Sequence, residues 1–426
     1  MTKRGPAANV RLNRDFWLLL SGRLVSFVGD QAQFFALPLV TLAATGSATQ
    51  AGVVSGLGTM SYLLFGLVAG ALVDRWNRKR TMIWCEIGRA VLVATVVVAL
   101  CWGRLTVAQL YLFAILTGVL STLFQSANSA ALPNVVPADQ LPTALGYNET
   151  LYNAVRIFGA VAAGALYALG RVVPFALNAV SFAVSGLSLR FIRAEFQKQE
   201  RAKARPKLTT DIRVGLSWLW HQPVIRFLTL VNAADNVRYG AGYLVIVVLA
   251  QQAKASSVQI GLIFSAAAVG ALLGALVSDR VTKRYPLGRI AVAMLWIEAL
   301  GFPLYALAPN VTLIGVVAAI ESLVAPVYMV AMTAYRLSIT PDELRGRTSS
   351  AISTLTTGAL SLGTVASGAL ISWLGARGTV LVLGAWMVGL AVVTSANRAV
   401  RTAPVAAPAA PAVPEGSQGT PVSAEA

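Results

Sequence analysis

Residues 70–80 read GALVDRWNRKR and join two long apolar runs. Asp74 follows the first run, and a cluster of cations (Arg75, Arg78, Lys79, Arg80) precedes the second. A second copy with one extra residue, GALVSDR, occupies residues 274–280, about 204 residues further on. Flanking Gly and Pro residues recur at the same offset: Gly66 and Gly270, Pro137 and Pro341, Gly159 and Gly363, Gly164 and Gly368. Such self-similarity in a chain of 426 residues predicts two copies of one half.

The composition places both halves in a membrane. The chain is 56% hydrophobic and only 12% charged, which is too apolar for a soluble protein. Apolar runs of roughly 18–25 residues are long enough to cross about 30 Å of hydrocarbon as helices. The sequence therefore predicts an all-α integral membrane protein whose twelve transmembrane helices form two six-helix parallel repeats. We expect these helices at residues 16–44, 51–73, 81–103, 106–132, 146–168, 173–192, 224–250, 257–277, 289–308, 311–338, 350–374 and 379–397.

We divide the chain into five parts on this basis. The six-helix halves span residues 15–192 and 223–400, and a cytoplasmic linker at 193–222 joins them. Within the linker, residues 210–221 (TDIRVGLSWLWH) predict a short amphipathic helix on the membrane surface. A basic cytoplasmic tail at 1–14 and an Ala/Pro-rich tail at 401–426, expected to be disordered, complete the chain.

The distribution of the net charge of +17 sets the orientation. With the N-terminus inside, the cytoplasmic loops and tails hold 24 Lys and Arg, whereas the outer loops hold four. This is the positive-inside bias of membrane proteins rather than a nucleic-acid-binding stripe, so we expect no nucleic-acid partner. Both termini are then cytoplasmic, and the protein is a multi-pass protein of the inner or plasma membrane. Two Cys and one His indicate neither a disulfide framework nor a metal site.

Ionisable side chains in the first transmembrane helix are the main functional candidates of the first half. Arg23 and Asp30 share one helix face with Ser26 and Gln33. Asp30 lies near the bilayer midplane, where a carboxylate costs on the order of 3 kcal/mol unless it has a partner or faces water. A purely structural ion pair is the alternative. We pair Asp30 with Arg23 and rank it as the strongest candidate proton carrier.

Other polar residues support a wet interior. The third helix carries Glu86 and Arg89 at a spacing of i, i+3, which we interpret as a structural pair. The fourth helix offers Thr117, Ser121, Gln125 and Asn128 on one face, and the fifth offers Glu149, Tyr152, Asn153 and Arg156. We expect the stripe on the fifth helix to line a cavity.

The second half repeats this pattern with different residues. Asp235 lies one residue from the position that corresponds to Asp30, and Arg238 follows it on the same helix. Glu321 in the tenth helix shares a face with Tyr328 and Tyr335, which predicts a cavity face or plain packing. Glu298 lies at mid-depth in the ninth helix. We rank it below the others, because the family resemblance described next makes that helix peripheral.

The repeated loop resembles the signature of the major facilitator superfamily, Gly-x-Leu-x-Asp-Arg-x-Gly-Arg-Lys/Arg. Gly70, Asp74, Arg75 and Arg78 match it, and Asp279 and Arg280 stand in the degenerate second copy. The resemblance covers residues 15–400 and implies that these loop residues act in a conformational switch. Asn77 replaces a usual Gly, and we expect Asn to tolerate the left-handed turn there.

More narrowly, the chain resembles the macrolide-efflux and enterobactin-exporter branch. The matching residues include Gly29-Asp30, residues 36–39 (ALPL), 132–137 (LPNVVP) and 340–347 (TPDELRGR). The chain departs from many drug/proton antiporters by lacking an Arg in the fourth helix and by having Gly159-Ala160 where Gly-Pro is usual.

The resemblance implies a central cavity lined by helices 1, 4, 7 and 10 and flanked by 2, 5, 8 and 11, with the two halves rocking against each other. We expect a monomer that exports a small amphipathic compound, such as a drug, antibiotic or siderophore, in exchange for protons. No phosphate-binding loop is present, so no cofactor is expected and a proton gradient must supply the energy. The alternatives are a proton-coupled importer and a non-transporting membrane scaffold or sensor. An enzyme is not expected, because no nucleophile–base or metal-ligand constellation occurs.

Overall fold

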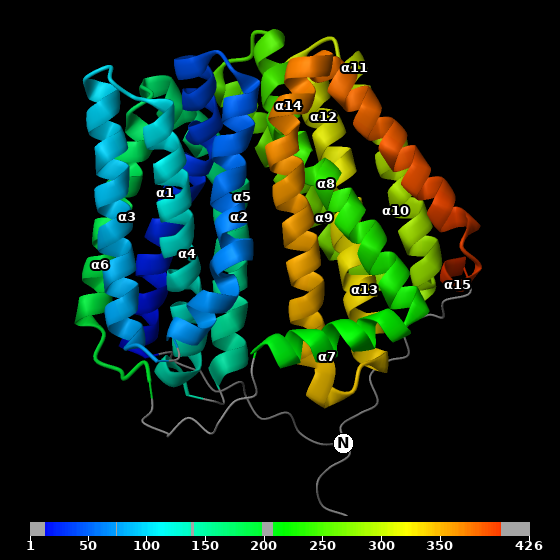
Figure 1. The fold of residues 1–426 in the computed structure, drawn as a ribbon, viewed down its shortest axis with the longest axis horizontal. Coiled ribbons are helices and arrows are strands. Elements are labelled where there is room, and N and C mark those ends of the chain that lie inside the picture. The colour runs from blue at the N-terminus through cyan, green and yellow to red at the C-terminus, as the bar shows by residue number, and fades with distance from the viewer. Residues whose placement is uncertain (1–12, 74, 138–139, 198–207, 402–426) are drawn as a thin grey trace, which may run out of the picture.

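The computed structural model describes residues 13–73, 75–137, 140–197 and 208–401, and these residues form helices without any strand. Asp74, most of both predicted tails and the middle of the linker lie outside the described residues. In Figure 1 the first half (blue to cyan-green) and the second half (green to orange-red) stand side by side. The helices are α1(Arg14–Thr45), α2(Ala48–Val73), α3(Arg78–Cys101), α4(Val107–Val135), α5(Leu141–Leu169), α6(Val173–Phe191), α7(Leu208–His221), α8(Pro223–Gln252), α9(Ser257–Arg284), α10(Leu287–Gly301), α11(Leu304–Leu307), α12(Val311–Ser322), α13(Val324–Ile339), α14(Asp342–Ala396) and α15(Arg398–Arg401).

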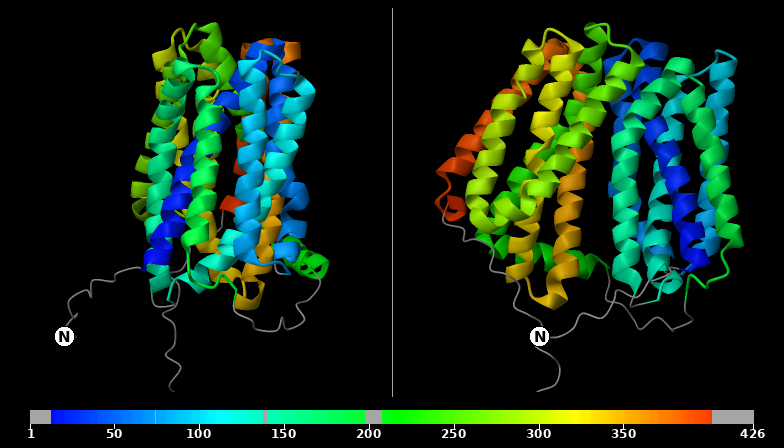
Figure 2. Two further views of the ribbon diagram at one scale, coloured as in Figure 1. Left: turned by 90° about the vertical axis from the view of Figure 1, so that its left-hand side faces the viewer. Right: turned by 180° about the vertical axis from the view of Figure 1, so that it is seen from behind.

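The helices agree with an arrangement that crosses a membrane twelve times. Nine helical segments of the described part are long and apolar enough to span a bilayer. One of them, Arg347–Ala396, has 50 residues, about 75 Å at 1.5 Å per residue, and is therefore long enough for two passes. It turns at Gly375, whose φ of 70° lies in the left-handed region that glycine adopts without steric cost. α2 and α8 run alongside these segments (Figures 1 and 2).

Proline explains two breaks that the hydropathy pattern did not predict. The expected helix at 289–308 is divided into α10 and α11 at Phe302 and Pro303. The expected helix at 311–338 is divided into α12 and α13 at Leu323. Pro326 lies in the first turn of α13, where its missing N–H is tolerated. In a continuous helix its ring would clash with the Ser322 carbonyl, so the helix is interrupted before it.

Local hydrogen bonds fix several helix ends. The Asn13 side chain accepts from the Phe16 N–H and caps α1, and Ser256 with Gln259 forms a capping box on α9. Asn77 has φ −69° and ψ 110° and accepts from the Arg80 N–H. Our expectation of a left-handed Asn77 is therefore wrong, because this residue serves as the N-cap of α3, a position that Asn favours.

The predicted amphipathic helix of the linker is α7, which crosses the lower end of the second half in Figure 1. Leu219 is buried in the core formed by α8, α10 and α13, whereas Trp220 is half exposed. We call this end of the bundle, where α1 begins, α2 ends and α7 lies, the basic end. The other end is the opposite end.

The two halves contact each other closely toward the opposite end. Gly52 of α2 faces Gly368 of α14, and Thr49 Oγ1 lies 2.8 Å from Ser372 Oγ. On the other side of the bundle, Ser265 Oγ of α9 donates to the Ile157 carbonyl of α5 over 2.6 Å. We call these α2–α14 and α5–α9 contacts the seam.

An internal cavity extends toward the basic end. Leu132 near the end of α4 and Leu145 near the start of α5 both line it. The seam contacts lie toward the opposite end, so this cavity lies on the basic side of the seam.

The orientation leads to the first prediction. In a Cys101→Ser background, which removes the exposed native thiol, cysteines at Gly103 and Arg171 should react with an impermeant reagent added to intact cells. Cysteines at Asn77 and Arg280 should react only after the membrane is opened, because these exposed positions lie at the basic end. The reverse labelling pattern would contradict the orientation of the bundle.

Candidate functional site

Two adjoining cavities lie between the helices of the two halves. A cavity of about 740 Å³ is formed by α1 to α6, and one of about 370 Å³ lies among α8 to α14 with α1, α2 and α5. Both cavities share the residues Gln31, Phe34, Ser55, Thr59 and Arg156 in their walls. They therefore meet at the middle of the molecule, beside the seam.

The first cavity contains the polar stripes expected from the sequence. The residues of the fourth and fifth helices that we expected on one face all line it: Thr117, Ser121, Gln125, Asn128, Glu149, Tyr152, Asn153 and Arg156. Arg23 and Asp30 also lie in its wall. The expected cavity face of α5 is thus present, and the functional roles of these residues stay predictions.

Asp30 forms an ion pair that the sequence did not predict. Arg89 Nη1 of α3 lies 3.6 Å from Asp30 Oδ2, and Arg89 Nη2 lies 2.7 Å from Glu86 Oε2. Arg23 instead donates to Gln125 Oε1 over 2.9 Å. Arg23 lies two helical turns from Asp30 on α1, as expected, and α3 brings another cation directly beside Asp30. The coupling of Arg23 to Asp30 stays a prediction.

Arg89 is held firmly in this position. Its guanidinium lies 4.8 Å from the ring centre of Phe124 and 4.2 Å from that of Phe182, distances at which cation–π attraction operates. Ser185 Oγ donates to Glu86 Oε1 over 2.7 Å. The predicted Glu86–Arg89 pair is present, but it also joins Asp30 to one buried network. The Asp30 side chain remains 37% exposed toward the cavity.

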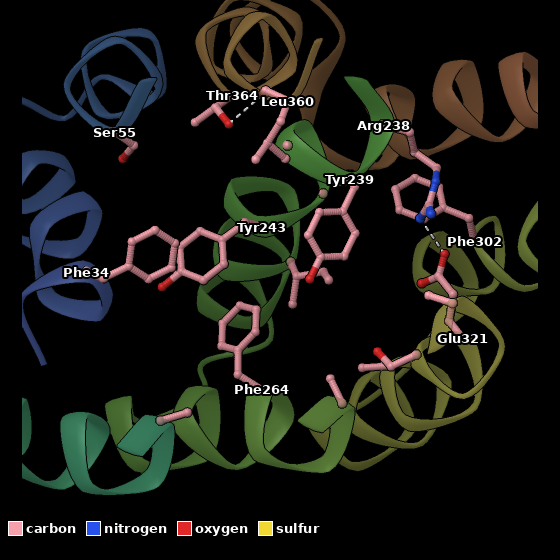
Figure 3. A pocket seen from close by; sticks show the side chains of 18 of the residues that line it. Phe34, Ser55, Arg238, Tyr239, Tyr243, Phe264, Phe302, Glu321, Leu360 and Thr364 are labelled. Carbon is pink, nitrogen blue, oxygen red and sulfur yellow. Dashed lines mark hydrogen bonds and ion pairs between the residues drawn. The ribbon is translucent and has the colours of Figure 1, made fainter. Parts of the chain in front are cut away.

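The second cavity has an aromatic wall and a charged wall. Figure 3 shows the rings of Phe34, Tyr243 and Phe264 along one side and Tyr239 near the middle. Phe34 and Tyr243 are 4.8 Å apart between ring centres, and Tyr243 stacks on Phe264 at 4.6 Å. Because Phe34 belongs to α1 and Tyr243 to α8, this aromatic wall joins the two halves.

Arg238 is the centre of the charged wall. Its Nε donates to Asp235 Oδ1 over 2.9 Å and its Nη1 to Glu321 Oε1 over 2.5 Å, the latter shown dashed in Figure 3. Its Nη2 lies 3.5 Å from Glu298 Oε2. The guanidinium also lies 5.1 Å from the ring centre of Phe302. The structure thus brings together Asp235, Arg238 and Glu321, and all three line the cavity.

Glu298, which we ranked below the other carboxylates, also belongs to the charged wall. Glu298 is only 2% exposed, faces Arg238 and lines the second cavity. The family resemblance led us to treat its helix as peripheral, but α10 presents this one side chain inward. An ionisable residue in an otherwise apolar span was itself the signal that could have identified it.

The repeated loop has different structures in its two copies. Arg78 donates to the carbonyls of Ala130 and Phe196, and Lys79 donates to the Ile192 carbonyl over 2.6 Å, so the first copy ties α3 to α4 and to the chain after α6. Arg75 is exposed, and Asp74 lies outside the described residues. The second copy is not a turn at Asp279, because α9 continues to Arg284. Asp279 pairs there with Lys283 over 2.7 Å, and Arg280 is exposed.

Comparison with known proteins establishes the family. The family model described as Major Facilitator Superfamily matches residues 19–236 and again 228–422. The chain belongs to the major facilitator superfamily. The two matches fall on the two halves, as the internal repeat predicted. The protein is therefore a membrane transport protein and not an enzyme.

Curated relatives of this superfamily member include efflux proteins. It is 29% identical to the multidrug efflux pump Tap of Mycolicibacterium fortuitum, over 92% of this chain and 95% of Tap. It is 22% identical to macrolide efflux protein A of Streptococcus pyogenes, over 51% of this chain and 54% of that protein. The predicted resemblance to the macrolide-efflux branch is thereby confirmed.

Solved structures share the fold. The nucleoside transporter NupG superposes with a TM-score of 0.74 at 14% identity, covering 90% of this chain and 99% of NupG. A bacterial homologue of the iron transporter ferroportin, at 18% identity, gives a TM-score of 0.69 in its inward-facing state, covering 89% of this chain and 99% of the homologue. In its outward-facing state the TM-score is 0.58 at 20% identity, covering 90% of this chain and 99% of the homologue.

Proposed function

We propose that the chain is a secondary active transporter that exports a small amphipathic compound, a drug, antibiotic or siderophore, in exchange for protons. The second cavity carries this proposal, because an aromatic wall and a charged wall face each other across about 370 Å³. Apolar walls with a few placed polar groups are typical of sites for small molecules. The efflux proteins among its relatives support export as the direction.

Export requires access from the cytoplasm. By the positive-inside rule the basic end is cytoplasmic, and the cavities lie on that side of the seam. The greater likeness to the inward-facing ferroportin homologue supports the same assignment. In this proposal the described conformation takes up substrate from the cytoplasm. Rocking of the halves then opens the seam and closes the basic end.

A gradient supplies the energy in this proposal. Asp30, Asp235, Glu321 and Glu298 are among the buried or cavity-lining carboxylates, and protons could couple to transport through them. In this proposal the proton gradient across the cell membrane drives transport, and no cofactor takes part. One chain contains both cavities, so a monomer is sufficient for transport.

Drug resistance tests this function in cells. We expect expression of the protein in a host that lacks its own efflux pumps to raise the inhibitory concentration of a subset of amphipathic compounds, macrolides included. A protonophore should remove this protection. Hypersensitivity to the same compounds would support the importer instead, and an unchanged response to the whole panel would contradict export.

A further inference from the structure

The cluster around Arg238 contains more negative than positive charge. Three carboxylates, Asp235, Glu298 and Glu321, surround this single guanidinium. Their side chains are 10%, 3% and 10% exposed, and that of Arg238 is 5% exposed. If all four groups were ionised, two buried negative charges would have no matching cation. Buried charges without partners are strongly destabilising, so the cluster must bind a positive charge.

Of the three carboxylates, Glu298 interacts most weakly with Arg238. Asp235 and Glu321 each accept a hydrogen bond from the guanidinium, whereas Glu298 Oε2 makes none. Its distance of 3.5 Å from Nη2 exceeds that of a charge-assisted hydrogen bond. It is also the most deeply buried of the three. A carboxyl in this position is more stable neutral than ionised.

The neighbouring groups do not fully supply the missing charge. Arg156 of α5 lines the same cavity, but it is a single cation, and no ion pair joins it to these carboxylates among the described residues. Asp235, Arg238 and Tyr239 approach from α8, Tyr305 of α11 lies with Glu321 of α12 in the cavity wall, and Tyr328 approaches from α13. The Tyr328 hydroxyl donates to the Leu228 carbonyl. These tyrosines are hydrogen-bond donors without positive charge. A metal ion would have to lie against the guanidinium that all three carboxylates face, so a proton fits the site better.

The first half provides the contrast. There Asp30 and Glu86 share Arg89, and Arg23, Glu149 and Arg156 also line the cavity, so three carboxylates are matched by three cations. Asp30 is also partly solvated by the cavity. With every group ionised, the charges around the first cavity therefore cancel, and no bound proton is needed to balance them.

We propose that Glu298 carries the proton that is exchanged for substrate, and that Arg238 is the positioning residue that controls its release. This proposal rests on proton-coupled export. A substrate that contacts Asp235 or Glu321 in the second cavity competes for their bonds to Arg238. The freed guanidinium turns to Glu298, whose O–H bond then breaks. The proton passes to water in the cavity and leaves through the basic end, and after substrate release on the other side the carboxylate takes up a new proton there.

Infrared spectroscopy of the purified full-length protein tests the bound proton without any substrate. We expect wild type at neutral pH to show the C=O stretching band of a protonated carboxyl buried in the protein. Glu298→Gln should lose this band, whereas the matched variant Glu195→Gln, at an exposed position, should keep it. A band that is absent from wild type or persists in Glu298→Gln overturns the proposal.

The same variants have a stability readout. Gln is nearly isosteric with a neutral Glu, so Glu298→Gln should unfold at the same temperature as Glu195→Gln. A marked fall in this temperature would mean that Glu298 is ionised in the native protein and would also overturn the proposal.

Transport assays distinguish the proposed role of Glu298 from that of Asp30. In proteoliposomes, Glu298→Gln should lose gradient-driven accumulation of substrate completely while it still exchanges substrate down a concentration gradient. Asp30→Asn should keep gradient-driven accumulation, and Glu195→Gln should match wild type. Uphill accumulation by Glu298→Gln, or its loss in Asp30→Asn alone, contradicts the assignment. Absence of any gradient effect in wild type would contradict the proposed function, whereas the infrared result would still report on the proton.

Discussion

Replacement of Arg238 by Gln is expected to lower the free energy of unfolding by about 3–5 kcal/mol, the cost of leaving buried charges without their partner. Asp235 and Glu321 both lose a hydrogen bond to the guanidinium in this variant. Neither carboxylate has an alternative cation within the cluster. Thermal unfolding of the purified protein, followed by tryptophan fluorescence and size-exclusion chromatography, measures the loss.

Two further variants make this result specific to the charges. Arg213→Gln removes an exposed cation from α7 and should leave the unfolding temperature unchanged. Arg238→Gln combined with Glu321→Gln should recover part of the lost stability, because one unpaired carboxylate is then removed. If Arg238→Gln is as stable as Arg213→Gln, the carboxylates around Arg238 are not ionised and our description of the cluster is wrong.

Replacement of Gly368 by Leu is expected to shift the protein toward a state that is open at the opposite end. A side chain at Gly368 would lie only 2.6 Å from the Thr49 Cα and 2.9 Å from the Thr49 carbonyl across the seam. Such overpacking costs about 1–3 kcal/mol, and here it acts only on the state in which the seam is closed. The ratio of the two states should therefore change by roughly 5–150-fold.

Thiol labelling from outside the cell reports this shift. A cysteine at Ser55, which lines both cavities, should react faster with an impermeant reagent in Gly368→Leu than in the parental Cys101→Ser background. Gly389→Leu is the matched control, because a side chain there meets no described atom within 4 Å. Equal labelling rates in all three proteins would show that the seam does not control access.

The sequence predicted the spans well because a membrane imposes their length. The expected helix at 224–250 corresponds to Pro223–Gln252, and that at 173–192 corresponds to Val173–Phe191. An apolar run must match the hydrocarbon thickness, so few boundaries are possible. The breaks at Pro303 and Leu323 were missed, because hydropathy does not report where the backbone interrupts its hydrogen bonds within an apolar run.

The sequence predicted that Asp30, Asp235, Arg238 and Glu321 line a cavity, but it did not predict which of these residues form ion pairs. Arg23 and Asp30 were paired because they share one face of a helix, whereas the ion pair of Asp30 is with Arg89 on another helix. Glu298 and Asp235 are 63 positions apart, and both face Arg238. Whether two buried charges meet depends on how several helices pack and on how each is rotated about its axis. A sequence read one helix at a time does not determine those angles.

Gradient-driven accumulation in everted membrane vesicles tests the central claim most directly. Vesicles that contain the protein, given a labelled macrolide and a fluorescent amphipathic dye, should accumulate at least one of them when the lumen is made acidic. The accumulation should collapse with a protonophore, and control vesicles without the protein should show none. Release of these compounds from preloaded vesicles under the same gradient would contradict a proton-driven exporter. Transport at the same rate with and without the gradient would contradict it as well.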